Sequence, residues 1–138
     1  MKSIKTTLTV LLLVITVMLG ISCKKENITP KTTQEKVLGK WKIQSVSENY
    51  FFSGMPHVNT FSGVGEYADF RNDGKVYSFS RNNYDTAAYG IISDTKMWID
   101  LSTDIYTIQT LTDAELKLYL KEDIAAGEYT ETTLQLNK

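Results

Sequence analysis

Histidine and cysteine, the residues most often used in nucleophilic and metal chemistry, each occur once in the 138-residue chain, as His57 and Cys23. Two such residues are too few for a His/Cys zinc cluster. The segment from Asp69 superficially resembles a calcium loop, but Arg71 holds its third position and Ser80 its twelfth, where a bidentate glutamate is needed. Nucleophile-elbow, P-loop and dinucleotide-binding motifs do not occur. We therefore expect no enzymatic activity, no bound metal and no cofactor.

The amino terminus has the parts of an export signal. Two lysines precede an uncharged apolar run at residues 8–19, and small residues then lead directly to Cys23. A positive segment, an apolar segment of roughly 7–15 residues and a small-residue cleavage site define a secretory signal peptide. A membrane-spanning helix needs about 18 or more apolar residues, so this run is too short for a permanent span. We predict that residues 1–22 are a signal peptide.

The segment LGISC at residues 19–23 resembles the bacterial lipobox, although Gly20 stands where that pattern usually has Leu or another aliphatic residue. The resemblance implies cleavage before Cys23, diacylation of its thiol and a membrane partner reached through the lipid. Two or more acyl chains give stable anchoring. Lys24 rather than Asp follows the cysteine, which favours an outer-membrane location in the cell envelope. A plain secreted protein with one stray cysteine remains the alternative.

The charge balance and the polar spacer limit the function of the mature chain. Removing residues 1–22 takes two lysines and no acids from 15 basic and 16 acidic residues, leaving 13 and 16. Without basic blocks, a nucleic-acid surface is not expected. Residues 23–32 form a lipidated cysteine and a polar tether, and residues 33–138 are long enough for one small domain with its own core. We expect this domain to be a monomer.

Along residues 33–138 the dominant period is two, which is typical of strands that bury one face. A short helical turn is expected at 33–38, with Thr32 or Thr33 as its N-cap and Gly39 as its end. Eight consecutive short strands favour an all-β fold, an up-and-down antiparallel barrel that removes exposed edges by closing. The expected strands are 40–50, 65–71, 75–81, 84–92, 95–102, 104–110, 115–121 and 127–136.

The turn around Asp73 and Gly74 leaves one register open, because Asp-Gly suits more than one tight hairpin. A two-residue turn would place Phe70 opposite Tyr77. A three-residue turn with a bulge would place Phe70 opposite Val76. The inward face of residues 65–81 therefore stays undecided.

The segment LGKWKI at residues 38–43 resembles the Gly-x-Trp motif that opens the first strand of lipocalins. FRNDGKVYSF from Phe70, YTIQTLTDAELKLYL from Tyr106 and the closing TTLQLNK are similar to small lipocalin-like lipoproteins of bacteria. The resemblance implies a lipocalin-like barrel in which Trp41 packs at the closed end. The chain is short for this family, and an eight-stranded barrel is either filled by side chains or holds one small ligand. Both alternatives remain open.

The first functional hypothesis is a non-catalytic barrel that binds a small apolar or amphipathic molecule, with an arginine, Arg71 or Arg81, at the rim. The candidate ligand-binding residues are Trp41, Phe70, Tyr77, Phe79, Tyr89, Met97 and Tyr106. The irregular segment 52–64 is expected to be a lid, or a loop folded onto its own barrel, and carries Phe52, Met55, His57 and Phe61. The alternative is a filled barrel that docks an envelope protein through Tyr119 and Trp98.

Overall fold

The computed structural model describes residues 29–100 and 103–138, and residues 31–138 form one compact unit. The predicted signal peptide and the lipidation of Cys23 lie outside the described residues. Within the described ranges, no helix has the length and apolar character needed to cross a bilayer.

A single short helix, α2 (Thr33–Val37), precedes the strands. Its start is a capping box, in which the Thr32 hydroxyl accepts from the Glu35 backbone and the Glu35 carboxylate accepts from the Thr32 backbone. Gly39 follows with a φ of 109°, a conformation that glycine adopts without steric cost. The predicted helical turn and its N-cap residue Thr32 are thereby confirmed.

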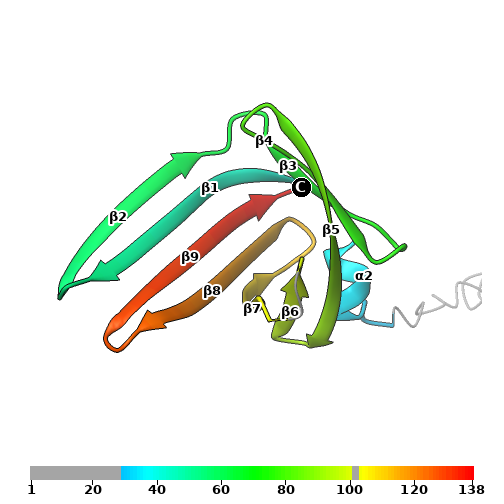
Figure 1. Ribbon diagram of the computed structural model, residues 1–138. Coiled ribbons are helices and arrows are strands. Elements are labelled where there is room, and N and C mark those ends of the chain that lie inside the picture. The colour runs from blue at the N-terminus through cyan, green and yellow to red at the C-terminus, as the bar shows by residue number, and fades with distance from the viewer. Residues whose placement is uncertain (1–28, 101–102) are drawn as a thin grey trace, which may run out of the picture. The chain divides into compact units, whose positions relative to one another are not determined.

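The strands follow one another with short connections (Figure 1). Their bounds are β1 Gly39–Phe52, β2 Met55–Ser62, β3 Tyr67–Phe70, β4 Lys75–Ser80, β5 Asn83–Ser93, β6 Lys96–Ile99, β7 Ile105–Leu111, β8 Glu115–Ala125 and β9 Glu128–Asn137. All pairings are antiparallel, and β9 pairs back to β1. Eight strands, β1 and β3 to β9, thus form the closed barrel that the sequence predicts, and β2 is a ninth strand outside the ring.

Strand β1 has two partners in succession on the same side. Its first residues, 39–42, pair with β3, whereas residues 45–52 pair with β2. A β-bulge at Gln44 and the turn at residues 63–66 make this change possible. Gly63 is buried there, and a Cβ at its position would lie 2.5 Å from the Ile43 carbonyl oxygen. The close approach of two backbones therefore requires glycine at position 63.

The prediction of an irregular segment at 52–64 is wrong, because β2 occupies most of it. Ser53 and Gly54 have positive φ angles of 51° and 78°, as in the two-residue turns that suit the twist of a hairpin. Strand β1 runs on to Phe52, and the chain returns beside it. Ser-Gly is a common turn dipeptide, and this signal was available in the sequence.

The core fills the barrel at the end next to α2. Its buried side chains alternate along the strands, as period two predicts, and they are Val37, Trp41, Ile43, Phe70, Val76, Tyr89, Met97, Ile108, Leu116, Leu118 and Leu136. The sequence left two registers open for this hairpin. The structure has the one in which Phe70 lies opposite Val76 and not opposite Tyr77. Tyr77 and Phe79 consequently point away from the core.

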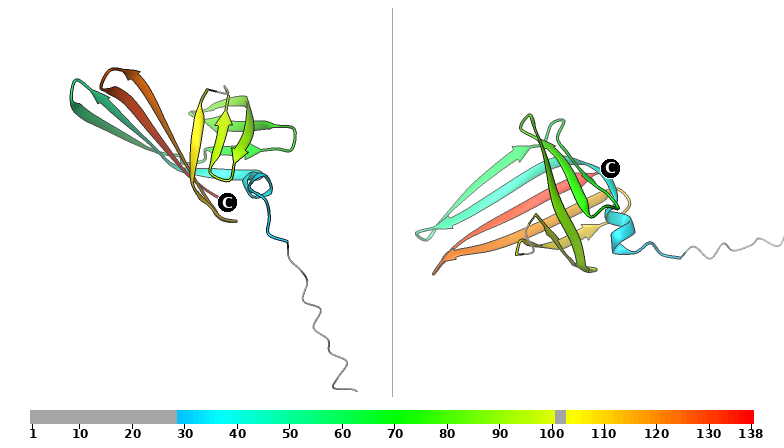
Figure 2. Two further views of the ribbon diagram at one scale, coloured as in Figure 1. Left: turned by 90° about the horizontal axis from the view of Figure 1, so that it is seen from below. Right: turned by 45° about the vertical axis from the view of Figure 1, so that its right-hand side comes forward.

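Four strands, in the order β2, β1, β9 and β8, continue beyond the core as what we call the extended sheet, residues 46–61 and 120–134. Figures 1 and 2 show it projecting from the part of the barrel formed by β3 to β7. Of the exposed large apolar side chains, six lie in this sheet: Tyr50, Phe52, Met55, Val58, Phe61 and Ile124.

Candidate functional site

The end of the barrel that carries α2 is closed by packing. The Trp41 indole N–H donates to the Val37 carbonyl oxygen at 2.7 Å, and the side chain is fully buried. The Lys138 ammonium lies 4.4 Å from the centre of the Trp41 ring. An ammonium over an indole face is a favourable cation–π arrangement. Trp41 therefore has the packing role that the Gly-x-Trp motif implies.

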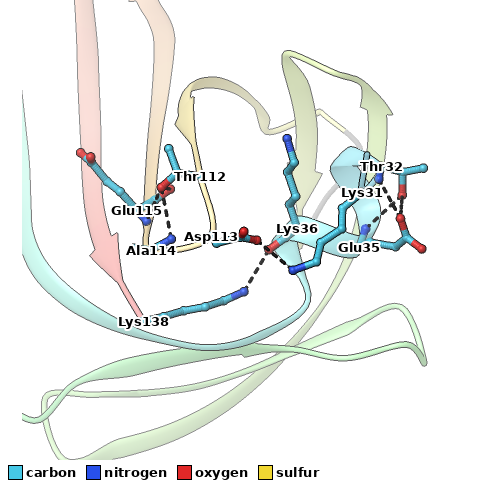
Figure 3. A network of polar contacts seen from close by, with 9 residues as sticks. All are labelled: Lys31, Thr32, Glu35, Lys36, Thr112, Asp113, Ala114, Glu115 and Lys138. Atoms are coloured by element: carbon cyan, nitrogen blue, oxygen red, sulfur yellow. Dashed lines mark hydrogen bonds and ion pairs between the residues drawn. The ribbon is translucent and has the colours of Figure 1, made fainter. Parts of the chain in front are cut away.

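Polar contacts fasten α2 to the carboxyl-terminal half of the chain (Figure 3). Lys31 forms an ion pair with Asp113 at 2.9 Å, and the Lys138 ammonium donates to the Lys36 carbonyl oxygen at 3.2 Å. The Lys31–Asp113 pair is exposed, so its contribution to stability is small. These contacts nevertheless hold the start of the domain beside the β7–β8 turn.

A cavity of about 530 Å³ lies towards the other end, where the extended sheet diverges from β4 and β5. Sites for small ligands commonly have volumes of about 300–1,000 Å³. Its lining residues are Val46, Phe61, Ser62, Glu66, Ser78, Ser80, Arg81, Asn83 and Asp85. Ser78 pairs with Ala68 and Asp85, on the strand face that carries Val76 in the core. The cavity thus continues the barrel interior beyond the core.

The two walls of this cavity differ in chemistry. The extended sheet supplies the apolar side chains Val46 and Phe61, which are paired across β1 and β2. The opposite wall supplies hydroxyl, amide and carboxylate groups from Ser78, Asn83 and Asp85. An apolar wall facing convergent polar groups is the usual composition of a site for a small amphipathic molecule.

Glu66 and Arg81 join the two walls at the rim. The Glu66 carboxylate accepts a hydrogen bond from the Arg81 backbone N–H at 2.8 Å. The Arg81 guanidinium lies 5.3 Å from the centre of the Phe61 ring. Both residues of the β4–β5 turn have positive φ angles, 49° at Arg81 and 61° at Asn82. This turn places one cationic side chain over the apolar wall, as expected for a rim arginine.

Four of the predicted ligand-binding residues belong to the packed core. Trp41, Phe70, Tyr89 and Met97 are all buried, and none of them lines the cavity at the rim. Phe70 and Tyr89 meet edge to face, with ring centres 5.0 Å apart. The Tyr89 hydroxyl donates to the Arg71 carbonyl oxygen and accepts from the Gln34 amide, which ties α2 to the β3–β4 turn. Burial raises the pKa of Tyr89.

Tyr77 and Phe79, two of the candidate ligand-binding residues on the hairpin whose inward face was left open, point outward. Phe79 packs between Tyr67 and Tyr84 on the outer surface, with ring centres 6.0 and 4.8 Å away. Tyr77 lies under the Arg71 guanidinium, and its hydroxyl donates to Asp73. The physical reason is the register of the β3–β4 hairpin, which turns Val76, Ser78 and Ser80 inward instead.

Tyr106 pairs with Met97 and is half-buried. Burial is the main reason that its pKa is raised, and the charges of Asp104, Glu122 and Asp100 raise it further. Its phenol therefore stays neutral across the physiological range.

The predicted lid residues do not gather over the cavity. Phe52, Met55 and His57 are exposed on the β1–β2 hairpin, and only Phe61 lines the cavity. His57 lies opposite Tyr50 in the extended sheet. Sequence reasoning also missed seven lining residues, most of them polar residues that carry no strong signal in a strand or turn. They are Val46, Ser62, Glu66, Ser78, Ser80, Asn83 and Asp85.

The outer face has a polar and aromatic cluster in the extended sheet. Tyr119 donates to Glu131 at 2.7 Å, and this hydrogen bond is the main reason that the pKa of Tyr119 is raised to about 12. Phe51 stacks on Tyr129 at 5.1 Å. Trp98 is half-buried over Gly90, and strand β7 separates its strand from that of Tyr119. Tyr119 and Trp98 therefore do not form one continuous exposed patch.

Among the described residues, no group of three or more His, Cys, Asp or Glu side chains is arranged to hold a metal ion. No protein-family profile matches the chain. No curated protein is significantly similar to it.

Proposed function

We propose that this chain is a lipid-anchored, non-catalytic binding protein of the cell envelope that takes up a small amphipathic molecule. The cavity of about 530 Å³ carries this proposal, because its apolar wall and its polar wall suit the two parts of such a ligand. The barrel is compatible with a binding protein. The core fills the interior near α2, so a ligand would occupy the space beside Phe61 and not the centre of the barrel.

The anchor is part of the same proposal and is supported by the sequence. The lipobox-like segment ends at Cys23. Eight residues separate this cysteine from Thr32, the N-cap of α2. The likeness to bacterial lipocalin-like lipoproteins and the lysine after Cys23 favour the outer membrane. Labelling of the cells with palmitate, followed by membrane fractionation, tests the anchor. We expect the wild-type chain to carry the label and to sediment with membranes, and Cys23→Ser to lose both.

The experiment for the ligand is native mass spectrometry of the lipidated protein purified from its own host. We expect a small molecule to copurify with the wild-type chain and to be lost in Ser78→Leu, because a larger side chain on the inward face fills the cavity. Thr86→Leu is the matched control, since Thr86 pairs with Tyr77 on the outward face and is exposed. A mass retained in Ser78→Leu, or absent from folded wild-type protein, would contradict the proposal.

A second function is favoured by a different observation. The extended sheet exposes Phe52, Met55 and Val58, each more than half accessible, and the interior near α2 is filled. Exposed apolar groups of this kind are common at sites of protein contact. If Phe52→Ser abolishes capture of an envelope protein while ligand binding is never detected, the chain is an interaction module.

A further inference from the structure

Strand β2 is an edge of the sheet over its whole length. It pairs with β1 on one side, and no described strand pairs with its other side. All eight residues, Met55–Ser62, are exposed. Proteins usually protect such edges with charged side chains, especially lysine, or with proline, because an open edge is a template for another strand. Strand β2 has one proline, Pro56. Strand β2 contains no Lys, Arg, Asp or Glu, in a chain with 31 such residues, 15 basic and 16 acidic.

The direction of the backbone groups in β2 follows from its hairpin. Phe52 and Met55 flank a two-residue turn, so they form a hydrogen-bonded pair, and such pairs recur at every second residue. The Gly63 N–H donates to the Gln44 carbonyl oxygen, which confirms that odd-numbered residues face β1. The backbone groups of the even-numbered residues therefore point outward, and these residues are Pro56, Val58, Thr60 and Ser62.

Pro56 has no N–H, so three outward donors remain on each β2 strand, at Val58, Thr60 and Ser62. We propose that β2 pairs antiparallel with β2 of a second copy of this chain, about a twofold axis at Asn59. Val58 then lies opposite Thr60 of the second copy, and Pro56 lies opposite Ser62 of the second copy. All six outward N–H groups find a carbonyl oxygen, and the missing donor at Pro56 leaves no N–H unpaired. This arrangement replaces the expected monomer.

The side chains permit the same register. Phe61 meets His57 of the second copy on one face, and Val58 meets Thr60 of the second copy on the other. No charged side chain opposes another across the pair, so like-charge repulsion within the strands is absent in spite of the acidic chain. A partner of opposite charge would require charges on this edge, and β2 has none. Charge matching therefore favours a second copy over a charged partner.

The symmetry also agrees with the anchor. Two antiparallel strands of one sheet are related by a twofold axis perpendicular to that sheet, so equivalent points lie at equal heights along it. The two chains enter their domains at Lys31 on the same side, which allows both lipids to enter one membrane. The pairing does not depend on the proposed ligand, although Phe61 and Ser62 belong both to β2 and to the cavity wall.

Oxidative cross-linking of the full chain in host membranes tests the register. Asn59 would sit directly across the axis in a pair without hydrogen bonds, where Cα atoms are about 4.5 Å apart, within the range that a disulfide spans. We expect Asn59→Cys to give a covalent homodimer. Thr60→Cys, whose equivalent in the second copy lies two residues out of register, and the remote exposed Ile92→Cys should not. The wild-type chain controls for Cys23.

A second measurement separates pairing from misfolding. Thr60→Pro removes an outward N–H and leaves the backbone hydrogen bonds to β1 intact, since the Thr60 N–H points away from β1. The Thr60 hydroxyl, which donates to Ser47 Oγ of β1 at 3.5 Å, is lost equally in Thr60→Ala. Native mass measurement in detergent should show the dimer weakened at least about tenfold relative to Thr60→Ala, from two lost hydrogen bonds. Equal dimer content in these two variants, or an Asn59→Cys adduct with a different protein, would overturn the proposal.

Discussion

Trp41 and Phe52 lie on the same strand, β1, yet Trp41 is fully buried whereas Phe52 is 58% exposed. The difference arises from what faces each side chain. At Trp41 the barrel is closed and α2 covers its end, whereas at Phe52 the strand has left the ring and belongs to the extended sheet. The first region is packed in the core, and the second leaves large apolar side chains exposed. Both are made from one continuous strand.

The largest expected effect separates these two regions directly. Trp41→Ala removes a buried indole and its hydrogen bond to Val37, and we expect the free energy of unfolding to fall by about 3–5 kcal/mol. Phe52→Ala should change it by less than about 0.5 kcal/mol, as is usual for exposed positions. Urea unfolding followed by tryptophan or far-ultraviolet signals measures both. Similar losses for the two variants would show that the extended sheet is part of the core.

A smaller effect is expected at the junction of the two regions. Gly63→Ala places a Cβ 2.5 Å from the Ile43 carbonyl oxygen, and the two backbones must separate to accommodate it. We expect a loss of about 1–3 kcal/mol in unfolding free energy, the usual cost of overpacking. Ser62→Ala, at the neighbouring exposed position, is the control. Unchanged stability in Gly63→Ala would mean that β2 and β3 are not held against β1 at this point.

The smallest effect concerns the outer face of the extended sheet. The hydrogen bond to Glu131 raises the pKa of Tyr119 to about 12, so the folded chain retains a proton that the unfolded chain loses near pH 10. Its contribution to stability is therefore complete below about pH 10 and is lost as the pH rises towards 12. Tyr119→Phe should cost about 1 kcal/mol at neutral pH.

The control for this pH dependence is Tyr84→Phe, at an exposed position on β5. Urea unfolding between pH 8 and 12, in wild type and in both variants, measures the dependence. We expect the decline above about pH 10 to be shallower in Tyr119→Phe than in wild type and unchanged in Tyr84→Phe. The same slope in Tyr119→Phe as in wild type would show that the Tyr119–Glu131 bond does not stabilise the extended sheet.

Much of the fold follows from local patterns that the sequence carries openly. The alternation of Leu116, Leu118 and Leu120 with polar residues assigned one buried face to β8, and all three are buried. The Gly-x-Trp segment placed Trp41 at the closed end. These features depend on period two, on turn residues and on capping, and each is encoded within a few consecutive positions.

The candidate site is encoded differently. Ser78 and Asp85 become cavity residues only because the β3–β4 and β4–β5 registers turn them inward, and Tyr77 is turned outward by the same registers. A shift of one residue reverses every side chain in a strand, so aromatic content alone could not identify the lining. The strand β2 was also missed, because its few apolar residues resemble those of a loop.

The sequence by itself determined the order of eight of the nine strands and the buried end of the barrel, and it carries the export-signal pattern that ends at Cys23. The tertiary structure decided where the pairing partner of β1 changes from β3 to β2. This change of partner depends on a bulge at Gln44 and a backbone contact at Gly63. The cavity and the unpaired edge of β2 both result from that change of partner. Its physical cause is a contact between segments about twenty residues apart, as shown by the Gly63 N–H bonded to the Gln44 carbonyl oxygen, which no local pattern specifies.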